Sequence, residues 1–263
     1  MRGEGFAAAL LCCASVGYCA DLKEIVQRAT AAINSDWAND PKYACVEKDQ
    51  ATKGGKTTDS AFQVVMLDGS EYHIDLPVDQ AGLAKLRDEA ARRKNESAAA
   101  RQKRIDEWKK HHDEDGEFLL DFAKVFDFDL LREEVRDGRT AYVLAAKPKP
   151  GFVPTTRAAK VLTGMTGTAW IDKATLHPLH VECHVIRPVP VFGPLASVLP
   201  GTQIDIGMTR VSDDVWLIDD VEMKLAVAKM HFLKSNEATR STYTQYAPNQ
   251  TLLQELLGKA GKP

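Results

Sequence analysis

The second half of the chain, from Arg139 to Tyr246, alternates apolar and polar residues over most of its length, and short turns divide the alternating stretches. Side chains on a β-strand point alternately to the two faces of a sheet, so this pattern predicts strands with one buried face. Strands that follow one another through short turns usually pair antiparallel. We therefore expect one antiparallel sheet whose apolar face must be covered by other parts of the chain.

The predicted interior combines three of these strands with a preceding helix. The strands near residues 179–186, 202–209 and 216–227 carry apolar side chains at every second position, and the segment 113–126 has an apolar helical face. Neighbouring strands share a face, so these side chains should point into one interior. The predicted ligand-binding residues are Val181, Cys183, Ile204, Ile206, Met208, Val221, Met223, Leu225, Phe118, Phe122 and Phe126.

Two further stretches predict helices around the sheet. Residues 21–36 repeat apolar residues at helical spacing, and Asp21 is a suitable N-cap. Residues 79–108 are dense in Lys, Arg, Asp, Glu and Ala, with both charge signs interleaved, which predicts a largely solvated helix.

The net charge is −3, from 34 basic and 37 acidic residues, so nucleic acid is not an expected partner. The charged helix is instead a possible contact for a protein of the cell envelope.

The first twenty residues differ from the rest. The apolar run from Phe6 to Val16 is shorter than the roughly 20 residues that cross a bilayer and, with small residues near Ala20, is typical of a signal peptide. A buried N-terminal helix that is never removed is the alternative. No transmembrane span is expected in the mature chain. We expect a signal peptide over 1–20, one domain over 21–250 with a charged helical insertion at about 79–126, and a C-terminal helix and tail over 251–263.

Three of the seven histidines, His177, His180 and His184, lie within eight residues. His180, Glu182 and His184 share a strand face, but His180 and His184 would lie roughly 13 Å apart along an extended strand, too far to share an ion. Only an adjacent pair, helped by a neighbouring strand, could bind one. The sequence also lacks H-E-x-x-H and C-x-x-C, so no metal site is predicted.

Signatures of catalysis are missing as well. There is no G-x-S-x-G motif, and the G-G-K-T run at residues 54–57 lacks the spacing of a P-loop and indicates a hairpin turn. Pairs of carboxylates occur at turns and helix ends, where Asp is common. We therefore predict no catalytic residues and no cofactor. Cys45 and Cys183, outside the leader, either pair or remain two buried thiols.

Three stretches resemble the periplasmic lipoprotein-carrier superfamily, the LolA/LolB-like outer-membrane lipoprotein-sorting proteins. They are GTAWIDKATLHPLHVE (167–182), DDVWLIDDVEMKLA (213–226) and KMHFLKSNEATRSTYTQY (229–246), which are similar to the second half of those carriers. The resemblance implies an α+β fold: a single antiparallel sheet curled into an incomplete β-barrel, with helices covering its concave apolar side. It also implies a periplasmic or secreted protein that binds lipid or lipoprotein acyl chains.

Three functions follow from these expectations. The first is a non-enzymatic carrier or binding protein for a lipid or lipidated protein, and the second is an envelope interaction protein with a filled core. An envelope hydrolase is the third. The proline-rich segment 185–201 is either a lid or a loop closing one end of the barrel, and its prolines should keep it out of the sheet.

Overall fold

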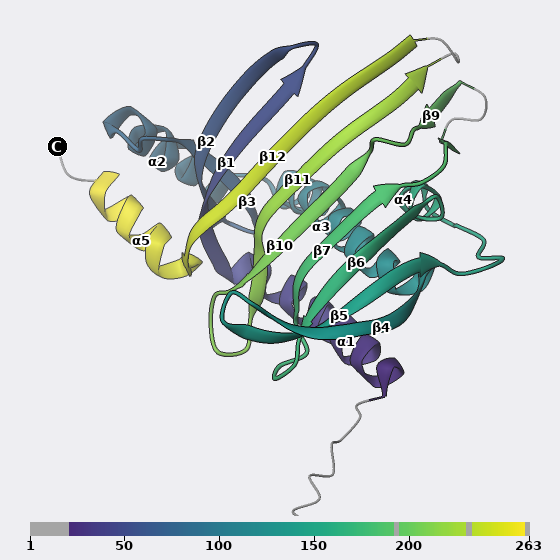
Figure 1. The fold of residues 1–263 in the computed structure, drawn as a ribbon. Helices are drawn as coiled ribbons and strands as arrows, with labels where there is room; N and C mark the ends of the chain where they lie inside the picture. The colour runs from purple at the N-terminus through teal and green to yellow at the C-terminus, as the bar shows by residue number, and fades with distance from the viewer. Residues whose placement is uncertain (1–20, 192–194, 230–232, 261–263) are drawn as a thin grey trace, which may run out of the picture.

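The computed structural model describes residues 21–191, 195–229 and 233–260, so the predicted signal peptide lies outside the described residues. Twelve strands form one antiparallel sheet. Ten of them follow the order β3-β2-β1-β12-β11-β10-β7-β6-β5-β4, the short strand β9 pairs with β11, and the two-residue β8 pairs with β9 (Figure 1). The end strands β3 and β4 are not neighbours, so the sheet stays open. The predicted α+β fold, an antiparallel sheet curled into an incomplete barrel, is confirmed.

The strand bounds follow the alternating pattern of the sequence. They are β1 (Tyr43–Lys53), β2 (Lys56–Leu67), β3 (Ser70–Asp75), β4 (Phe126–Arg136), β5 (Arg139–Pro148), β6 (Met165–Asp172), β7 (Pro178–Val185), β8 (Val189–Pro190), β9 (Ala196–Val198), β10 (Gln203–Arg210), β11 (Trp216–Lys229) and β12 (Leu233–Pro248).

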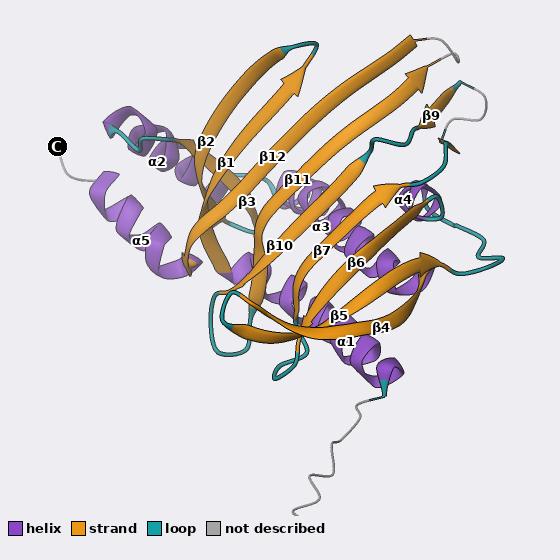
Figure 2. Ribbon diagram, in the orientation of Figure 1, coloured by secondary structure: helices purple, strands orange, loops and turns teal. Residues whose placement is uncertain are grey.

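Two helices cover one face of the sheet, which we call the inner face. These are α1 (Leu22–Asn39) and α3 (Ala98–Val125), which lie behind the sheet in Figure 2, with the short α4 (Arg157–Leu162) near the end of α3. The helices α2 (Gln80–Lys94) and α5 (Asn249–Ala260) pack on each other and on β1–β3 in a separate apolar cluster. A single 3₁₀ turn, η1 (Asp40–Lys42), links α1 to β1.

The first helix begins where the sequence predicts. Asp21 is its N-cap, and the Asp21 carboxylate accepts a hydrogen bond of 3.1 Å from the backbone N–H of Lys23. Ile25 and Ala29, one turn apart, are 1% and 5% exposed because this side of α1 packs on the sheet. The amphipathic spacing thus determines which side of α1 faces the strands.

Gly116 allows α1 and α3 to approach closely. A Cβ atom at this position would lie 2.3 Å from Nε1 of Trp37, which no side chain tolerates without displacing the indole. The same Trp37 Nε1–H donates a hydrogen bond of 2.9 Å to the backbone oxygen of His112 on α3. The glycine therefore lets the two inner helices lock together through Trp37.

The charged block 79–108 is less solvated than the sequence indicates. Arg93 is 6% exposed, and its guanidinium donates to the backbone oxygens of Leu67 and Ser70 at the β2–β3 turn. Arg104 bonds the Glu96 carboxylate, whose side chain is 8% exposed. Arg104 also donates to the Ser70 hydroxyl and to the backbone oxygen of Asp68, so the two cations fasten α2 and α3 to the β2–β3 hairpin. The prediction of a largely solvated helix is therefore wrong at these positions.

The proline-rich segment after β7 also differs from expectation. Its strand β9 pairs with β11, Val198 opposite Val227, and β8 pairs with β9, Val189 opposite Val198. The prediction that prolines keep this segment out of the sheet is wrong, because Pro190 lies at the end of the two-residue β8 and β9 itself contains no proline.

Candidate functional site

The three predicted strands lie side by side and present their apolar residues to the inner face. Val181 pairs with Ile206, and Ile206 pairs with Val221, while Cys183 pairs with Ile204. The alternation fails at two bulges in these strands. Leu179 is skipped where β7 bulges against β6, and it packs with Trp170 and Trp216 in another cluster. Asp219 of β11 is skipped opposite Gly207 and Met208 of β10. Nine of the eleven predicted residues belong to or pack on one core cluster: Val181, Cys183, Ile204, Ile206, Val221, Leu225, Phe118, Phe122 and Phe126.

The three phenylalanines close this cluster from the end of α3. The Phe118 and Phe122 rings meet edge to face with centroids 5.3 Å apart, and the Phe122 and Phe126 centroids are 5.7 Å apart. Phe126, which begins β4, is 1% exposed. Much of the predicted interior is therefore filled by the protein's own side chains.

The two predicted methionines lie in different surroundings. Met208 lines the space under the helices, as described below. Met223 pairs with Ile204 and Thr239, yet its side chain is 37% exposed. Met223 therefore lies beyond the packed part of the inner face.

A small apolar cavity of about 60 Å³ remains between α1, α3 and strands β5–β7 and β10. Its lining includes Val26 of α1, Phe122 of α3, and Val181, Ile206 and Met208 of the sheet. That volume is on the order of two water molecules, well below the roughly 300 Å³ at which ligand sites begin. Four of the predicted residues, Phe122, Val181, Ile206 and Met208, line this cavity.

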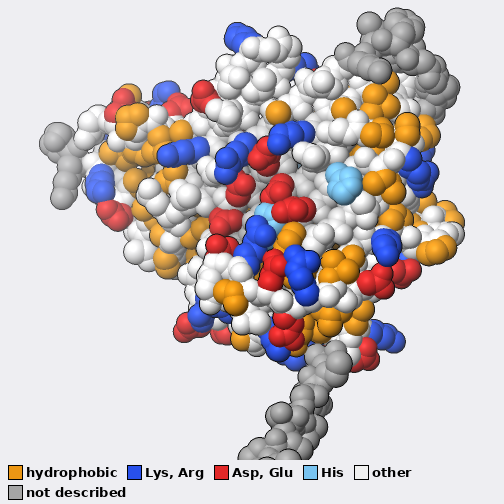
Figure 3. All heavy atoms as spheres, viewed as in Figure 1, with side chains coloured by type: hydrophobic (Ala, Val, Ile, Leu, Met, Phe, Trp, Pro, Cys, Tyr) orange, Lys and Arg blue, Asp and Glu red, His pale blue; other side chains and the backbone are white. Residues whose placement is uncertain are grey.

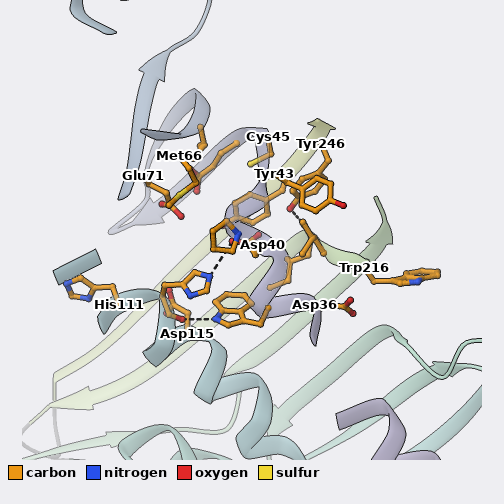
Figure 4. Close-up of a pocket in the computed structure, with 18 of the residues that line it drawn as sticks. Asp36, Asp40, Tyr43, Cys45, Met66, Glu71, His111, Asp115, Trp216 and Tyr246 are labelled. Carbon is orange, nitrogen blue, oxygen red and sulfur yellow. Dashed lines mark hydrogen bonds and ion pairs between the residues drawn. The ribbon is translucent and has the colours of Figure 1, made fainter. Parts of the chain in front are cut away.

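A larger cavity of about 280 Å³ adjoins it on the side of β1–β3 and β12 (Figure 4). Ile33 of α1, Leu119 of α3 and Met208 of β10 line both cavities, so the two are neighbours across these three side chains. The small cavity has an apolar lining, whereas the lining of the larger cavity is rich in aromatic and acidic side chains. Its distinctive members are Trp37, Trp108, Tyr43, Tyr243, Tyr246, Asp36, Asp40, Glu47, Glu71 and Asp115.

Burial perturbs the carboxylates of this lining. It raises the pKa of Asp36 to about 6, and it also raises the pKa of Glu71 and of Asp115. Glu47, whose side chain is 17% exposed, contacts Nε2 of His73 at 3.2 Å. The Asp40 carboxylate lies 3.4 Å from Nε2 of His112. The larger cavity therefore concentrates negative charge in a partly dehydrated space.

Aromatic rings are stacked beside these carboxylates. The His112 ring lies 4.5 Å from the Trp37 ring and 4.9 Å from the Trp108 ring, measured between centroids. Across the cavity, the Tyr246 hydroxyl donates a hydrogen bond of 2.6 Å to the backbone oxygen of Ile218 (Figure 4). The aromatic walls are held in place by packing and by these bonds.

Sequence reasoning missed the larger cavity almost entirely, since Met208 is its one member among the predicted residues. Its walls come from α1, η1, β1–β3, α3, β10, β11 and β12, which lie up to about two hundred positions apart in the chain. The signal available was weak: Trp37, Tyr243 and Tyr246 are large residues in otherwise polar stretches.

The opposite, outer face carries the histidine cluster. His180 Nε2 lies 3.2 Å from Glu182 Oε1 and 3.1 Å from Asp205 Oδ1, and acidic side chains gather in the middle of this face (Figure 3). Within the described ranges, this trio has ligand atoms within 4.8 Å of one another, as a metal site requires. His184 is not part of it, and Asp205 reaches His180 from the neighbouring strand β10. The absence of a bound metal stays a prediction.

The two cysteines are free, buried thiols. Burial raises the pKa of both Cys45 and Cys183 to about 12, so neither is a thiolate at neutral pH. Cys45 lines the larger cavity but has none of the activation that a nucleophile needs.

No protein-family model matches the chain, and no curated protein matches it in sequence. Solved structures match its fold over most of its length. A putative outer membrane lipoprotein-sorting protein domain from Vibrio parahaemolyticus is 11% identical, with a TM-score of 0.36, over 87% of this chain and 99% of that chain.

Two further structures show the same likeness. A LolA superfamily protein from Nitrosomonas europaea is 12% identical, with a TM-score of 0.32, over 85% of this chain and 91% of that chain. A Pseudomonas aeruginosa structure of MucB with MucA is 13% identical, with a TM-score of 0.25, over 84% of this chain and 98% of that chain. The likeness concerns the fold. None of the described helices combines the length and apolarity needed to cross a membrane.

Proposed function

We propose that this chain is a non-enzymatic binding protein of the periplasm or cell exterior that holds the apolar tail of a lipid or lipidated protein beneath α1 and α3. The observation that carries the proposal is the contact between the two cavities across Ile33, Leu119 and Met208. One end is apolar, and the other is aromatic and charged. That arrangement suits an amphiphile, with its tail in the apolar end and its head in the larger cavity.

The energetics favour a tail at the apolar end. Each buried methylene of an acyl chain contributes about 0.8 kcal/mol. The empty space of about 60 Å³ takes the end of a tail, and Met208, an unbranched and flexible side chain, can move to admit more of it. In the larger cavity, Cys45 carries a protonated thiol at neutral pH, which fits a role in binding rather than catalysis.

Binding can be tested with N-phenyl-1-naphthylamine, an uncharged probe whose fluorescence rises in apolar surroundings. We expect saturable enhancement with the intact protein. Met208→Trp, which fills the space that both cavities share, should weaken binding at least about tenfold, the equivalent of roughly two buried methylenes. Met223→Trp is the matched control, since Met223 is exposed on the same sheet, and it should leave affinity within a factor of about two.

Circular dichroism must first show that both variants keep the parent fold. If the parent gives no saturable enhancement, or if both tryptophan variants bind as the parent does, the proposed function is wrong.

A protein-interaction role is the second candidate, and edge strand β4 favours it. Its outer edge has no partner strand among the described residues, and Leu130, Leu131 and Val135 on it are 42%, 54% and 71% exposed. An exposed apolar edge strand is a common site for pairing with another protein. The interaction role becomes the better account if the probe fails to bind.

A further inference from the structure

On the basis of the proposed function, we infer that the head group bound in the larger cavity carries a positive charge, so that the ligand is an amphiphile with an ammonium group. Three features of the cavity lead to this class of ligand: its charge balance, its aromatic walls and a nearly fully buried carboxylate.

The charge balance of the lining is one-sided. Five carboxylates line the cavity, from Asp36, Asp40, Glu47, Glu71 and Asp115. Its basic side chains are the three histidines His73, His111 and His112, and no Lys or Arg of the described chain lines it. In the same part of the chain, none of the five forms an ion pair with a Lys or Arg; their charged neighbours are histidines. Asp115 is exposed, but the other four carboxylates are buried or half-buried. Such carboxylates are costly without a counter-charge, and a bound cation would supply one.

The carboxylates come from different elements and surround one space. Glu71 lies on β3, Asp40 in η1 and Asp115 on α3, and Figure 4 shows them around the same hollow. A head group placed between them would interact with several carboxylates at once. An anionic head group in the same place would be repelled by all of them.

The aromatic walls recognise the same chemistry. A cation is attracted to the face of Trp and Tyr rings, and aromatic cages are a common way to bind ammonium groups. Trp37 and Trp108 lie on the helix side of the cavity, and Tyr43, Tyr243 and Tyr246 lie on the strand side. Quaternary ammonium groups cannot donate hydrogen bonds, so rings and carboxylates together are what such a group requires.

Asp36 is the most buried of these carboxylates. Its side chain is 2% exposed, and within the described structure neither carboxylate oxygen accepts a well-formed hydrogen bond, although the backbone N–H of Trp216 lies close enough to lower the pKa of Asp36. Its one ionic neighbour is Nε2 of His177, at 3.5 Å. A buried carboxylate without a full set of hydrogen bonds is unusual, and a cation bound in the cavity would supply a further interaction.

The test is displacement of N-phenyl-1-naphthylamine at pH 8 by three amphiphiles with the same twelve-carbon tail, each below its micelle-forming concentration. These are dodecyltrimethylammonium, dodecylphosphocholine and dodecanoate. We expect dodecyltrimethylammonium to displace the probe at a concentration at least about tenfold lower than dodecanoate. If dodecylphosphocholine matches it, a zwitterionic lipid is a suitable source of the ammonium group; if it lags behind, a purely cationic amphiphile is the better fit.

Variants locate the effect. Glu71→Gln and Glu47→Gln keep the side-chain shape and should weaken dodecyltrimethylammonium about fivefold or more, while affinity for the uncharged probe stays the same. Glu222→Gln, on the outer face, is the matched control and should change neither. If dodecanoate displaces the probe as well as or better than dodecyltrimethylammonium, the inference is overturned while the proposed function stands. If the probe itself does not bind, the proposed function fails first.

Discussion

Replacing Asp36 by Asn should stabilise the protein at alkaline pH. The Asp36 side chain lies almost wholly inside the structure, between α1 and the turn that contains His177, and among the described residues its oxygens accept no well-formed hydrogen bond, although the backbone N–H of Trp216 lies close enough to lower its pKa in part. Burial raises its pKa from 3.8 to about 6. A group whose pKa is higher in the folded state stabilises the fold when protonated, and this stabilisation is lost as the pH rises through about 6.

The magnitude follows from the size of the shift. A difference of about two pKa units corresponds to roughly 3 kcal/mol at a pH well above both values. Between pH 8 and pH 4.5 the penalty on the charged form falls by about 2 kcal/mol, because most Asp36 side chains are then protonated in the folded state. Asn avoids the penalty but buries two N–H donors, so we expect a net gain of about 1–2 kcal/mol at pH 8.

Urea unfolding followed by circular dichroism at pH 8 and pH 4.5 measures this effect. His177 faces Asp36, and burial lowers its own pKa, so the series is repeated in a His177→Gln background. Asp75→Asn, at an exposed position, is the control and should change stability little at either pH. A stability difference between Asp36→Asn and the parent that is the same at both pH values would refute the reasoning.

Three further predictions concern the packing and the outer face. Gly116→Ala should destabilise the protein by about 1–3 kcal/mol, because the new Cβ collides with Trp37, whereas Gly258→Ala, with open space around it, should be neutral or stabilising in thermal unfolding. Ile206→Asp should lower the free energy of unfolding by at least about 3 kcal/mol, since a buried carboxylate finds no partner there. Elemental analysis should find no stoichiometric zinc; one tightly held equivalent that is lost in His180→Ala would contradict that prediction.

The sheet could be predicted because its causes are local. In β7, β10 and β11 the two-residue period alone determines which side chains face inward, and the observed pairs of Val181 with Ile206 and of Ile206 with Val221 follow from it. The period fails where a strand bulges, as at Leu179, because one extra residue reverses the alternation. Pro178, next to Leu179, is a local hint of this bulge, because proline in a strand favours its first position or a bulge.

The larger cavity could not be predicted in the same way. Glu71 on β3, Asp115 on α3 and Tyr246 on β12 meet only because α3 crosses the inner face and β12 pairs with β1. That crossing depends in turn on the close approach at Gly116. The burial of Arg93 in the charged block 79–108 could not be predicted for a related reason, because its partners are backbone oxygens of a hairpin distant in the sequence.

The position of a bound tail tests the central claim most directly. Crystals of the protein grown with 12-bromododecyltrimethylammonium would reveal the bromine through its anomalous scattering. We predict a bromine peak in the apolar cavity between α1, α3 and the sheet, near Phe122, Val181 and Ile206, with the ammonium group beside Glu71. A bromine peak on the outer face of the sheet or along the β4 edge, with both cavities empty, would contradict the account.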